Sequence, residues 1–435
     1  MTVFSGLNSL KIKSFKNAIS SFVPPVVTVP LKQERGKELE CLVKPGETVE
    51  EGQLIATSKA DASSFSSNIY SPIPGKVESI EMTKCPDGTA SEAVKIRFGG
   101  SFTFLGRQKK ELSLATLTAH MLVRAICDAG ILNTFQTSAP VLLAADIQKA
   151  VDSNATTLVV RLFDDDPSRL TDSLISKLFF DHVIEGARLA AKACAVEKIV
   201  YVSDLKSKED ISQRYEKIET SPFKELFVYA DKRKYPVGFK FQLYKLILSE
   251  TKGTAFSSIS QNDLYTDSST MFELYRTVKF GMPVVDRYVH VNGDCLHASG
   301  LMRVLIGTKF DFIAEQYGNF LKKPSAVIVN GLLNGFASST VDVPVTKYCK
   351  SINFLTDSKT PAQRLAVCIR CGNCRRACPR SLSPDVIYRH ITGDLSASKD
   401  YIDSASLCDN CGLCSSVCPA RLPLGQQITD FIDKK

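Results

Sequence analysis

Two cysteine runs near the C-terminus have the residue type and spacing to bind iron–sulfur clusters. Both follow the pattern Cys-x2-Cys-x2-Cys-x3-Cys-Pro, and their members are Cys368, Cys371, Cys374, Cys378 and Pro379, then Cys408, Cys411, Cys414, Cys418 and Pro419. A short loop keeps three thiolates on one concave side, and the fourth cysteine of each run ligates the other cluster. We therefore predict two 4Fe–4S clusters with crossed ligands, one held by Cys368, Cys371, Cys374 and Cys418, the other by Cys408, Cys411, Cys414 and Cys378.

Two other uses of these cysteines fit the spacing less well. A structural zinc site takes two Cys-x2–4-Cys hooks, so a third cysteine at the next interval would be surplus. Disulfide frameworks are typical of exported chains, and the N-terminus carries no export signal pattern, so we expect no export. Two clusters with crossed ligands must lie close together, which predicts a module that carries single electrons. The other six cysteines lack ligand spacing and are interpreted as small buried hydrophobes: Cys41, Cys85, Cys127, Cys194, Cys295 and Cys349.

Charges around the two runs differ in sign. Four arginines accompany the first run, namely Arg370, Arg375, Arg376 and Arg380, whereas Asp409 lies inside the second. Positive charge stabilises the more negative, reduced form of a cluster. The sequence therefore predicts a higher reduction potential for the cluster of the first run.

Composition describes an ordinary globular chain. Its 435 residues are 44% hydrophobic and 23% charged, and this length suggests about three or four domains. No run approaches the ~18 uninterrupted apolar residues of a membrane helix. The net charge of +8 is spread out, which disfavours nucleic acid and better suits a basic surface that faces anionic lipid or an acidic redox partner.

Residues 1–110 are predicted to form an N-terminal arm and a β domain. The segments VKPGETVEEGQLIA (43–56) and SPIPGKV (71–77) resemble the lipoyl and biotinyl barrel-sandwich fold. Ser64 stands where those carriers place their modified lysine, and Lys59 is out of register, so we expect an unmodified barrel-sandwich hybrid domain. The basic start, residues 5–22, is interpreted as an extended arm, with an interfacial amphipathic helix as the alternative.

Residues 111–280 alternate helix-like and strand-like segments and predict an α/β domain. Helices are expected over residues 117–129 and 171–195, and strands over 157–163, 199–202 and 226–230. Asp164, Asp165 and Asp166 follow the first strand and predict a loop and helix cap, with a magnesium or ribose site as the alternative. The domain contains neither a GxGxxG motif nor a Walker loop, so the sequence gives no direct indication of a nucleotide site here.

The last two predicted domains are residues 281–357 and 358–435. The first is a small mixed β domain of the β-grasp type with one short helix over residues 310–317, and His290 and His297 in it are interpreted as structural. The second is a helical two-cluster ferredoxin domain, preceded by a linker at residues 358–361. Ser383 and Pro384 predict a helix start between the runs, because Ser is favoured at the N-cap and Pro at the first helical position.

This order of domains resembles the RnfC family, the peripheral iron–sulfur subunits of Rnf ion-translocating electron-transport complexes. The likeness extends over nearly the whole chain. Beyond the cysteines and residues 43–56, it rests on segments at 30–37, 183–188, 284–308 and 342–345. The resemblance implies membership of a translocase that couples electron transfer between ferredoxin and NAD to ion movement. It implies a peripheral position on the cytoplasmic face of the inner membrane.

The resemblance also implies partners and cofactors. Its partners would be other Rnf-type subunits and a ferredoxin or ferredoxin-like subunit, and the polypeptide would supply no catalytic residue, serving as an electron relay. The α/β domain would be similar to the flavin- and NADH-binding subunit of respiratory complex I.

The sequence departs from that flavin subunit in three segments. Residues 130–140 lack the expected glycine-rich loop, residues 162–166 replace the flavin-contacting strand end, and only Tyr235–Gly238 remains of a later glycine motif. A Cβ would obstruct backbone approach to a flavin phosphate, so the departure argues against FMN and NADH. Two other functions remain open: a soluble NADH:acceptor oxidoreductase with its own flavin, and a cluster-bearing assembly scaffold. The donor, the coupled ion and the direction of flux are not predicted.

Overall fold

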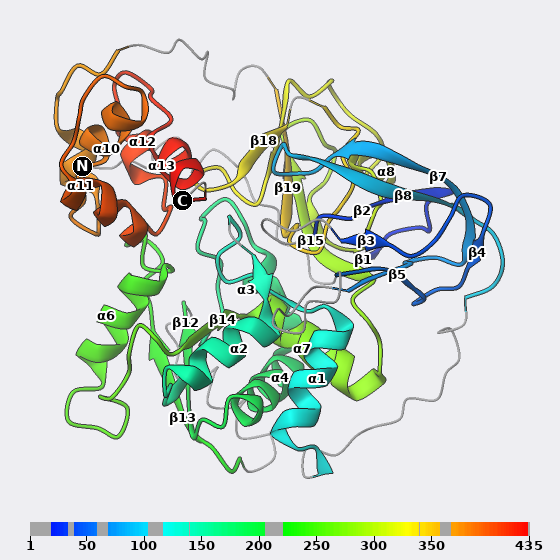
Figure 1. The fold of residues 1–435 in the computed structure, drawn as a ribbon, viewed down its shortest axis with the longest axis horizontal. Helices are drawn as coiled ribbons and strands as arrows, with labels where there is room; N and C mark the ends of the chain where they lie inside the picture. The colour runs from blue at the N-terminus through cyan, green and yellow to red at the C-terminus, as the bar shows by residue number, and fades with distance from the viewer. Residues whose placement is uncertain are drawn as a thin grey trace.

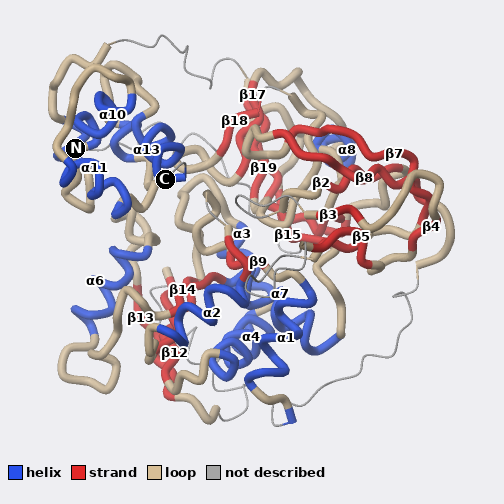
Figure 2. Tube along the Cα trace, viewed as in Figure 1, coloured by secondary structure: helices blue, strands red, loops and turns tan. Residues whose placement is uncertain are grey.

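The computed structural model describes residues 19–33, 39–58, 68–102, 116–138, 140–204, 221–338, 340–356 and 367–433. In Figure 1 a β domain and a six-stranded sheet lie at the upper right, an α/β layer lies below them, and a helical C-terminal lobe lies at the upper left. Figure 2 shows that the lobe is helical and that the strands gather in the other parts. No helix among the described residues is long and apolar enough to cross a membrane.

Two facing sheets form the N-terminal β domain. Their strands, in sheet order, are β2 (Val26–Pro30), β8 (Ala90–Phe98), β7 (Gly75–Lys84) and β4 (Thr48–Val49), then β3 (Glu40–Cys41), β5 (Leu54–Thr57) and β6 (Ile69–Tyr70). Val27, Val29, Ile55 and Ile96 are fully buried between them. Alternating burial along β8 is the pattern of a strand with one covered face. Lys59 and Ser64, on which the prediction of an unmodified domain rests, lie outside the described residues.

A parallel four-stranded sheet forms the centre of the α/β layer. The strands, in sheet order, are β13 (Lys224–Tyr229), β12 (Lys198–Ser203), β11 (Thr157–Arg161) and β14 (Leu264–Asp267). All residues of β11 are buried, as expected for a parallel strand covered on both faces. The helices are α1 (Ala119–Ala129), α2 (Leu143–Asp152), α3 (Thr171–Leu178), α4 (Phe180–Ala193), α6 (Lys240–Glu250) and α7 (Ser268–Phe280). A hairpin of β9 (Leu132–Asn133) and β10 (Val141–Leu142) connects α1 to α2.

The predicted single helix over residues 171–195 is wrong, because the chain breaks at Phe179 into α3 and α4. The break lets the Phe179 ring stack on Phe272, with 4.6 Å between centroids, and meet the edge of Tyr288 at 5.3 Å. Tertiary packing thus outweighs the continuous helical pattern. The helix over residues 117–129 is confirmed as α1, which ends at Gly130 in the left-handed conformation.

The predicted helix-cap role is confirmed for Asp164. Its carboxylate accepts hydrogen bonds from the backbone N–H of Asp172 at 3.1 Å and of Ser173 at 3.0 Å. Both donors lie in the first turn of α3, where backbone N–H groups lack helical partners.

A mixed six-stranded sheet follows. In sheet order its strands are β1 (Ile19–Ser20), β16 (Gly300–Leu305), β15 (Asp286–Gly293), β19 (Ser351–Leu355), β17 (Ala326–Val329) and β18 (Phe336–Ser338). The pairs β1–β16 and β15–β19 are parallel, and the other neighbours are antiparallel. The helix α8 (Phe310–Gln316) shares a buried core with this sheet. Most of the basic N-terminal segment lies outside the described residues, and only its end is seen, as the exposed strand β1.

The C-terminal lobe is an internal repeat. Its helices are α9 (Asn373–Ala377), α10 (Pro384–Ile391), α11 (Lys399–Ser404), α12 (Leu413–Ser416) and α13 (Leu424–Asp433), with the 3-10 turn η3 (Ala405–Leu407). Left-handed residues recur 40 positions apart, in the pairs Arg370 and Asn410, Gly372 and Gly412, and Ser381 and Arg421. Ser383 and Pro384 start α10 as predicted. The predicted linker at residues 358–361 lies outside the described residues.

Candidate metal centres

The C-terminal lobe contains two hollows, each lined by four cysteines. The first hollow is lined by Cys368, Cys371, Cys374 and Cys418. The second hollow is lined by Cys378, Cys408, Cys411 and Cys414. Each therefore takes three cysteines from one run and the last cysteine from the other run. These are the two sets that the spacing predicts.

Short helices position the third cysteine of each run. Gly372 and Gly412 precede α9 and α12 in the left-handed conformation, with φ of 73° and 72°, which a glycine adopts without a Cβ penalty. Backbone N–H groups also point at sulfur: Leu382 donates to Cys378 Sγ and Asn410 donates to Cys408 Sγ, both at 3.4 Å. Such hydrogen bonds stabilise a thiolate and help to set the potential of a bound cluster.

Apolar side chains complete the walls of both hollows. They are Leu422 and Leu424 in the first hollow and Leu382 and Ile428 in the second. Burial raises the pKa of the Cys408 thiol to about 11 and that of Cys414 to about 12, so metal binding here must displace protons. Four thiol donors in a hollow with apolar walls fit a 4Fe–4S cluster. Among the described side chains, no three His, Cys, Asp or Glu residues are grouped to bind a single metal ion.

Of the four arginines that accompany the first run, only Arg370 lines the first hollow. Arg375 forms a two-pronged ion pair with Asp385, at 2.6 and 2.7 Å, which offsets its charge. Arg380 lines the second hollow, where it donates to Leu407 O at 2.8 Å and lies 3.9 Å from Asp409. Arg380 reaches the second hollow because Cys378, two residues earlier, is the cysteine that the first run contributes to that hollow.

The α/β layer and the loop between β17 and β18 cover the second hollow. The Tyr235 hydroxyl donates to the carbonyl of Cys411, and Gln242 Nε2 donates to Pro379 O at 3.3 Å. A Cβ on Gly412 would lie 2.1 Å from Leu333 O, so the backbones touch. The first hollow is open by comparison, since Cys371 is exposed. One centre is therefore interior and the other lies at the surface.

The three segments that are expected to depart from a flavin subunit, residues 130–140, 162–166 and 235–238, pack against one another. Arg161, which is fully buried, donates to Gly238 O at 2.7 Å and to Phe135 O at 3.0 Å, and its guanidinium lies 4.3 Å from the Phe135 ring centroid. A Cβ on Gly238 would lie 2.8 Å from the Cα of Asp165. Side chains of this protein thus fill the space among residues 130–140, 162–166 and 235–238.

A buried ionic network continues from Arg161. Lys350 Nζ lies 2.8 Å from Asp172 and 2.7 Å from Asp267, with all three side chains fully buried. Arg169 pairs with Asp164 at 2.9 Å. Sequence reasoning missed Lys350 and Asp267, because their partners lie far away along the chain. The only signal was the density of charge directly after the buried strand β11.

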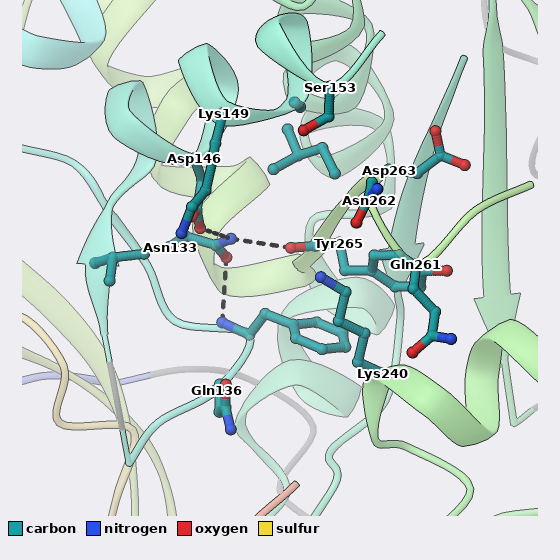
Figure 3. A pocket seen from close by; sticks show the side chains of 14 residues that line it. Asn133, Gln136, Asp146, Lys149, Ser153, Lys240, Gln261, Asn262, Asp263 and Tyr265 are labelled. Carbon is teal, nitrogen blue, oxygen red and sulfur yellow. Dashed lines mark hydrogen bonds between the residues drawn. The ribbon is translucent and has the colours of Figure 1, made fainter. Parts of the chain in front are cut away.

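A cavity of about 450 Å³ lies beside α2 and β14. In Figure 3, Lys149 and Lys240 reach it from opposite sides. Asn133 connects two sides of the cavity, because its Nδ2 donates to the Asp146 carboxylate at 2.8 Å and to Tyr265 O at 2.9 Å. Of the three segments that are expected to depart from a flavin subunit, only residues 130–140 contribute to this lining. Sequence reasoning did not find the cavity, because four separate segments build it.

Comparison with known families defines the class of protein. Residues 364–422 match a 4Fe-4S dicluster domain, and residues 6–101 match the RnfC barrel sandwich hybrid domain. The chain is thus a multidomain iron–sulfur protein. The predicted barrel-sandwich and ferredoxin domains are confirmed, and so is the resemblance to RnfC.

Curated relatives extend the likeness to most of the chain. The C subunit of the ion-translocating oxidoreductase complex of Rhodobacter capsulatus is 27% identical, over 86% of this chain and 72% of that protein. The C subunit of the proton-translocating ferredoxin:NAD(+) oxidoreductase complex of Clostridium ljungdahlii is 27% identical, over 84% and 78%. Its counterpart in the Na(+)-translocating complex of Acetobacterium woodii is 26% identical, over 83% and 80%.

Among solved structures, an NAD+-reducing NiFe hydrogenase in the H2-reduced state superposes with a TM-score of 0.49 at 15% identity. The match covers 71% of this chain and 63% of the hydrogenase chain.

Proposed function

We propose that this chain is the iron–sulfur electron-transfer subunit of an Rnf-type complex, which couples electron transfer of the ferredoxin/NAD type to ion translocation. The observation that carries the proposal is the pair of hollows, each lined by three cysteines of one run and the fourth of the other. The names of the relatives from C. ljungdahlii and A. woodii agree with it. Bound clusters would supply the one-electron chemistry, while the protein sets their ligands, burial and spacing.

The proposed ligands are Cys368, Cys371, Cys374 and Cys418 for the first cluster and Cys408, Cys411, Cys414 and Cys378 for the second. Anaerobic purification followed by iron, acid-labile sulfide and EPR analysis tests the assignment. Cys371→Ser and Cys418→Ser should remove or alter the same EPR signal, although they lie in different runs. Cys414→Ser should affect the other signal, and Cys127→Ser should affect neither. A Cys418→Ser protein that loses the signal of its own run would overturn the crossed assignment.

We propose the domain division 1–110, 111–280, 281–357 and 358–435. For residues 281–357 the β-grasp type is supported by the mixed sheet with parallel β15 and β19 and the packed helix α8. For residues 111–280 the parallel sheet with helices on both faces supports a relative of the complex I flavin subunit.

We further propose that the α/β domain binds neither FMN nor NADH. Arg161 fills the space among the three segments that would contact a flavin, and its hydrogen bonds to Phe135 O and Gly238 O hold them together. Acid release of cofactors from the purified protein, followed by flavin fluorescence, tests this. Stoichiometric flavin, together with reduction of the clusters by NADH, would instead favour a soluble NADH:acceptor oxidoreductase.

A peripheral position on the cytoplasmic face of the inner membrane, among other Rnf-type subunits, completes the proposal. Co-purification from native membranes with identification of the partner subunits is the direct test. Recovery of the chain alone from the soluble fraction would contradict it. Clusters that stay redox-silent in the physiological range would favour the assembly scaffold.

A further inference from the structure

The first hollow opens onto an exposed surface that combines apolar and basic side chains. We call this surface, made of Val367, Ile369, Arg370, Cys371 and Arg376, the outer face. Val367 is 81% exposed and Ile369 is 64% exposed, and Ile369, Arg370 and Cys371 line the first hollow. Exposed apolar side chains that gather in one patch rimmed by polar residues mark interaction surfaces.

The outer face carries positive charge that no carboxylate among the described residues offsets. Across the described part of the chain, no carboxylate oxygen lies within 4.0 Å of the Arg370 or Arg376 guanidinium. Among the described residues, Arg376 donates to the neutral side-chain amide oxygen of Asn373. Arg375 differs, because Asp385 pairs with it. Among the described residues, these two exposed guanidinium groups therefore have no carboxylate partner, and the exposed Val367 and Ile369 lie in the same run of the chain.

The second hollow is covered by contacts with other parts of the protein. Tyr235, Gln242 and Leu333 contact the backbone around it, and Arg380 packs over the Phe241 ring at 3.9 Å. A partner protein can approach the exposed Cys371 of the first hollow directly, whereas the α/β layer and the loop between β17 and β18 cover the second hollow. Electron transfer between proteins requires close approach, so the surface site is the one that a partner can use.

We propose that the outer face is the docking surface for an acidic one-electron carrier protein. This inference rests on the proposed function, since it requires a cluster in the first hollow. One electron would leave the reduced partner and be taken up by this chain, or the reverse, without a bond forming or breaking. Arg370 and Arg376 would attract the acidic surface of the carrier and raise the association rate. Val367 and Ile369 would exclude water at the centre of the contact.

The test compares two double charge reversals in the cluster-loaded full chain. Arg370→Glu/Arg376→Glu changes the outer face, and Lys76→Glu/Lys84→Glu makes the same charge change on β7 of the barrel-sandwich domain, where both lysines are exposed. The probe is a purified acidic ferredoxin. Stopped-flow absorbance gives the bimolecular rate constant of electron transfer, and calorimetric titration of the two oxidised proteins gives the Kd.

For the wild type we expect the rate constant to fall as salt is raised from about 20 to 200 mM, since salt screens steering. At low salt the outer-face variant should lose about tenfold in rate constant and bind correspondingly more weakly, with little remaining salt dependence. The β7 variant should stay within about twofold of the wild type. Ile369→Ser should weaken binding while keeping the salt dependence. Equal behaviour of the two double variants would overturn the proposal.

Two further measurements separate the causes of failure. Iron, sulfide and EPR analysis of each variant reports whether the clusters are present, so empty wild-type protein would refute the proposed function itself. Vesicles containing phosphatidylglycerol test the other anionic partner. If the outer-face variant loses vesicle binding but keeps its ferredoxin kinetics, the face binds lipid and the proposal is wrong.

Discussion

The hydroxyl of Tyr235 donates a hydrogen bond to the backbone carbonyl of Cys411, and this contact joins the α/β layer to the second hollow. Burial raises the pKa of Tyr235 well above its ordinary value, so the phenol stays protonated and remains a donor. Tyr235 belongs to residues 235–238, which the family resemblance predicts to be the remnant of a glycine motif. In this chain the same segment supports a proposed cluster ligand.

Tyr235→Phe should loosen the second hollow. The variant keeps the ring and removes the donor, which leaves a carbonyl without its partner and costs about 1 kcal/mol. Hydrogen–deuterium exchange of residues 408–414 should speed up, while residues 368–374 keep their protection. Tyr229→Phe, at an exposed position of β13, is the control and should change neither segment.

The two clusters should differ in reduction potential, with the first higher. The charges of Arg375 and Arg380 do not support this order, because Asp385 pairs with Arg375 and Arg380 lines the second hollow. The order rests on the solvent exposure of Cys371 and on Arg370, which has no carboxylate partner among the described residues. Water and positive charge both stabilise the more negative, reduced state of a cluster. EPR-monitored redox titration measures both potentials. Arg370→Gln should lower the first by up to about 60 mV, the equivalent of a tenfold change for one electron.

Arg380→Gln provides the matched test of the crossing. Arg380 follows the first run in sequence but lines the second hollow in space. Its removal should therefore lower the potential of the second cluster and leave the first unchanged. A shift confined to the first cluster would contradict the crossed arrangement.

Lys350→Met should destabilise the fold strongly. Burial acts to raise the pKa of Asp267, but the Lys350 ammonium and the Arg161 guanidinium outweigh it and hold that pKa below its usual range. Without the lysine, two buried carboxylates lose a partner, and loss of one side of such a group costs about 3–5 kcal/mol. Lys309→Met, which removes an ion pair with the exposed Asp342, should cost less than about 1 kcal/mol. Chemical denaturation of both variants measures the difference.

How far the sequence predicts this structure depends on how local the causes are. The cysteine sets follow from spacing within two short runs, and the strand β11 follows from a run of buried residues, so both are predictable. Arg161 is different: its partners at Phe135 and Gly238 lie 26 and 77 residues away. A long-range polar network produces no periodic pattern in the sequence. The packing of Phe179, which divides the predicted helix into α3 and α4, produces none either. The sequence also does not predict which charges lie near which hollow. Arg380 follows the first run but lines the hollow built mainly by the second run.

His290 should make stability fall with acidity. Burial lowers its pKa from 6.5 to about 4, with Asp164 favouring protonation and Arg169 opposing it. The folded state therefore holds the neutral imidazole, while the unfolded chain binds a proton below about pH 6.5. Stability is full above that pH and is lost as pH falls toward 4, by about 3 kcal/mol over the window. His290→Leu should remove this part of the pH dependence, whereas His297→Gln, at an exposed position, should retain it. Urea unfolding at pH 7.5, 6 and 5 measures the three proteins, and parallel slopes for His290→Leu and the wild type would refute the assignment.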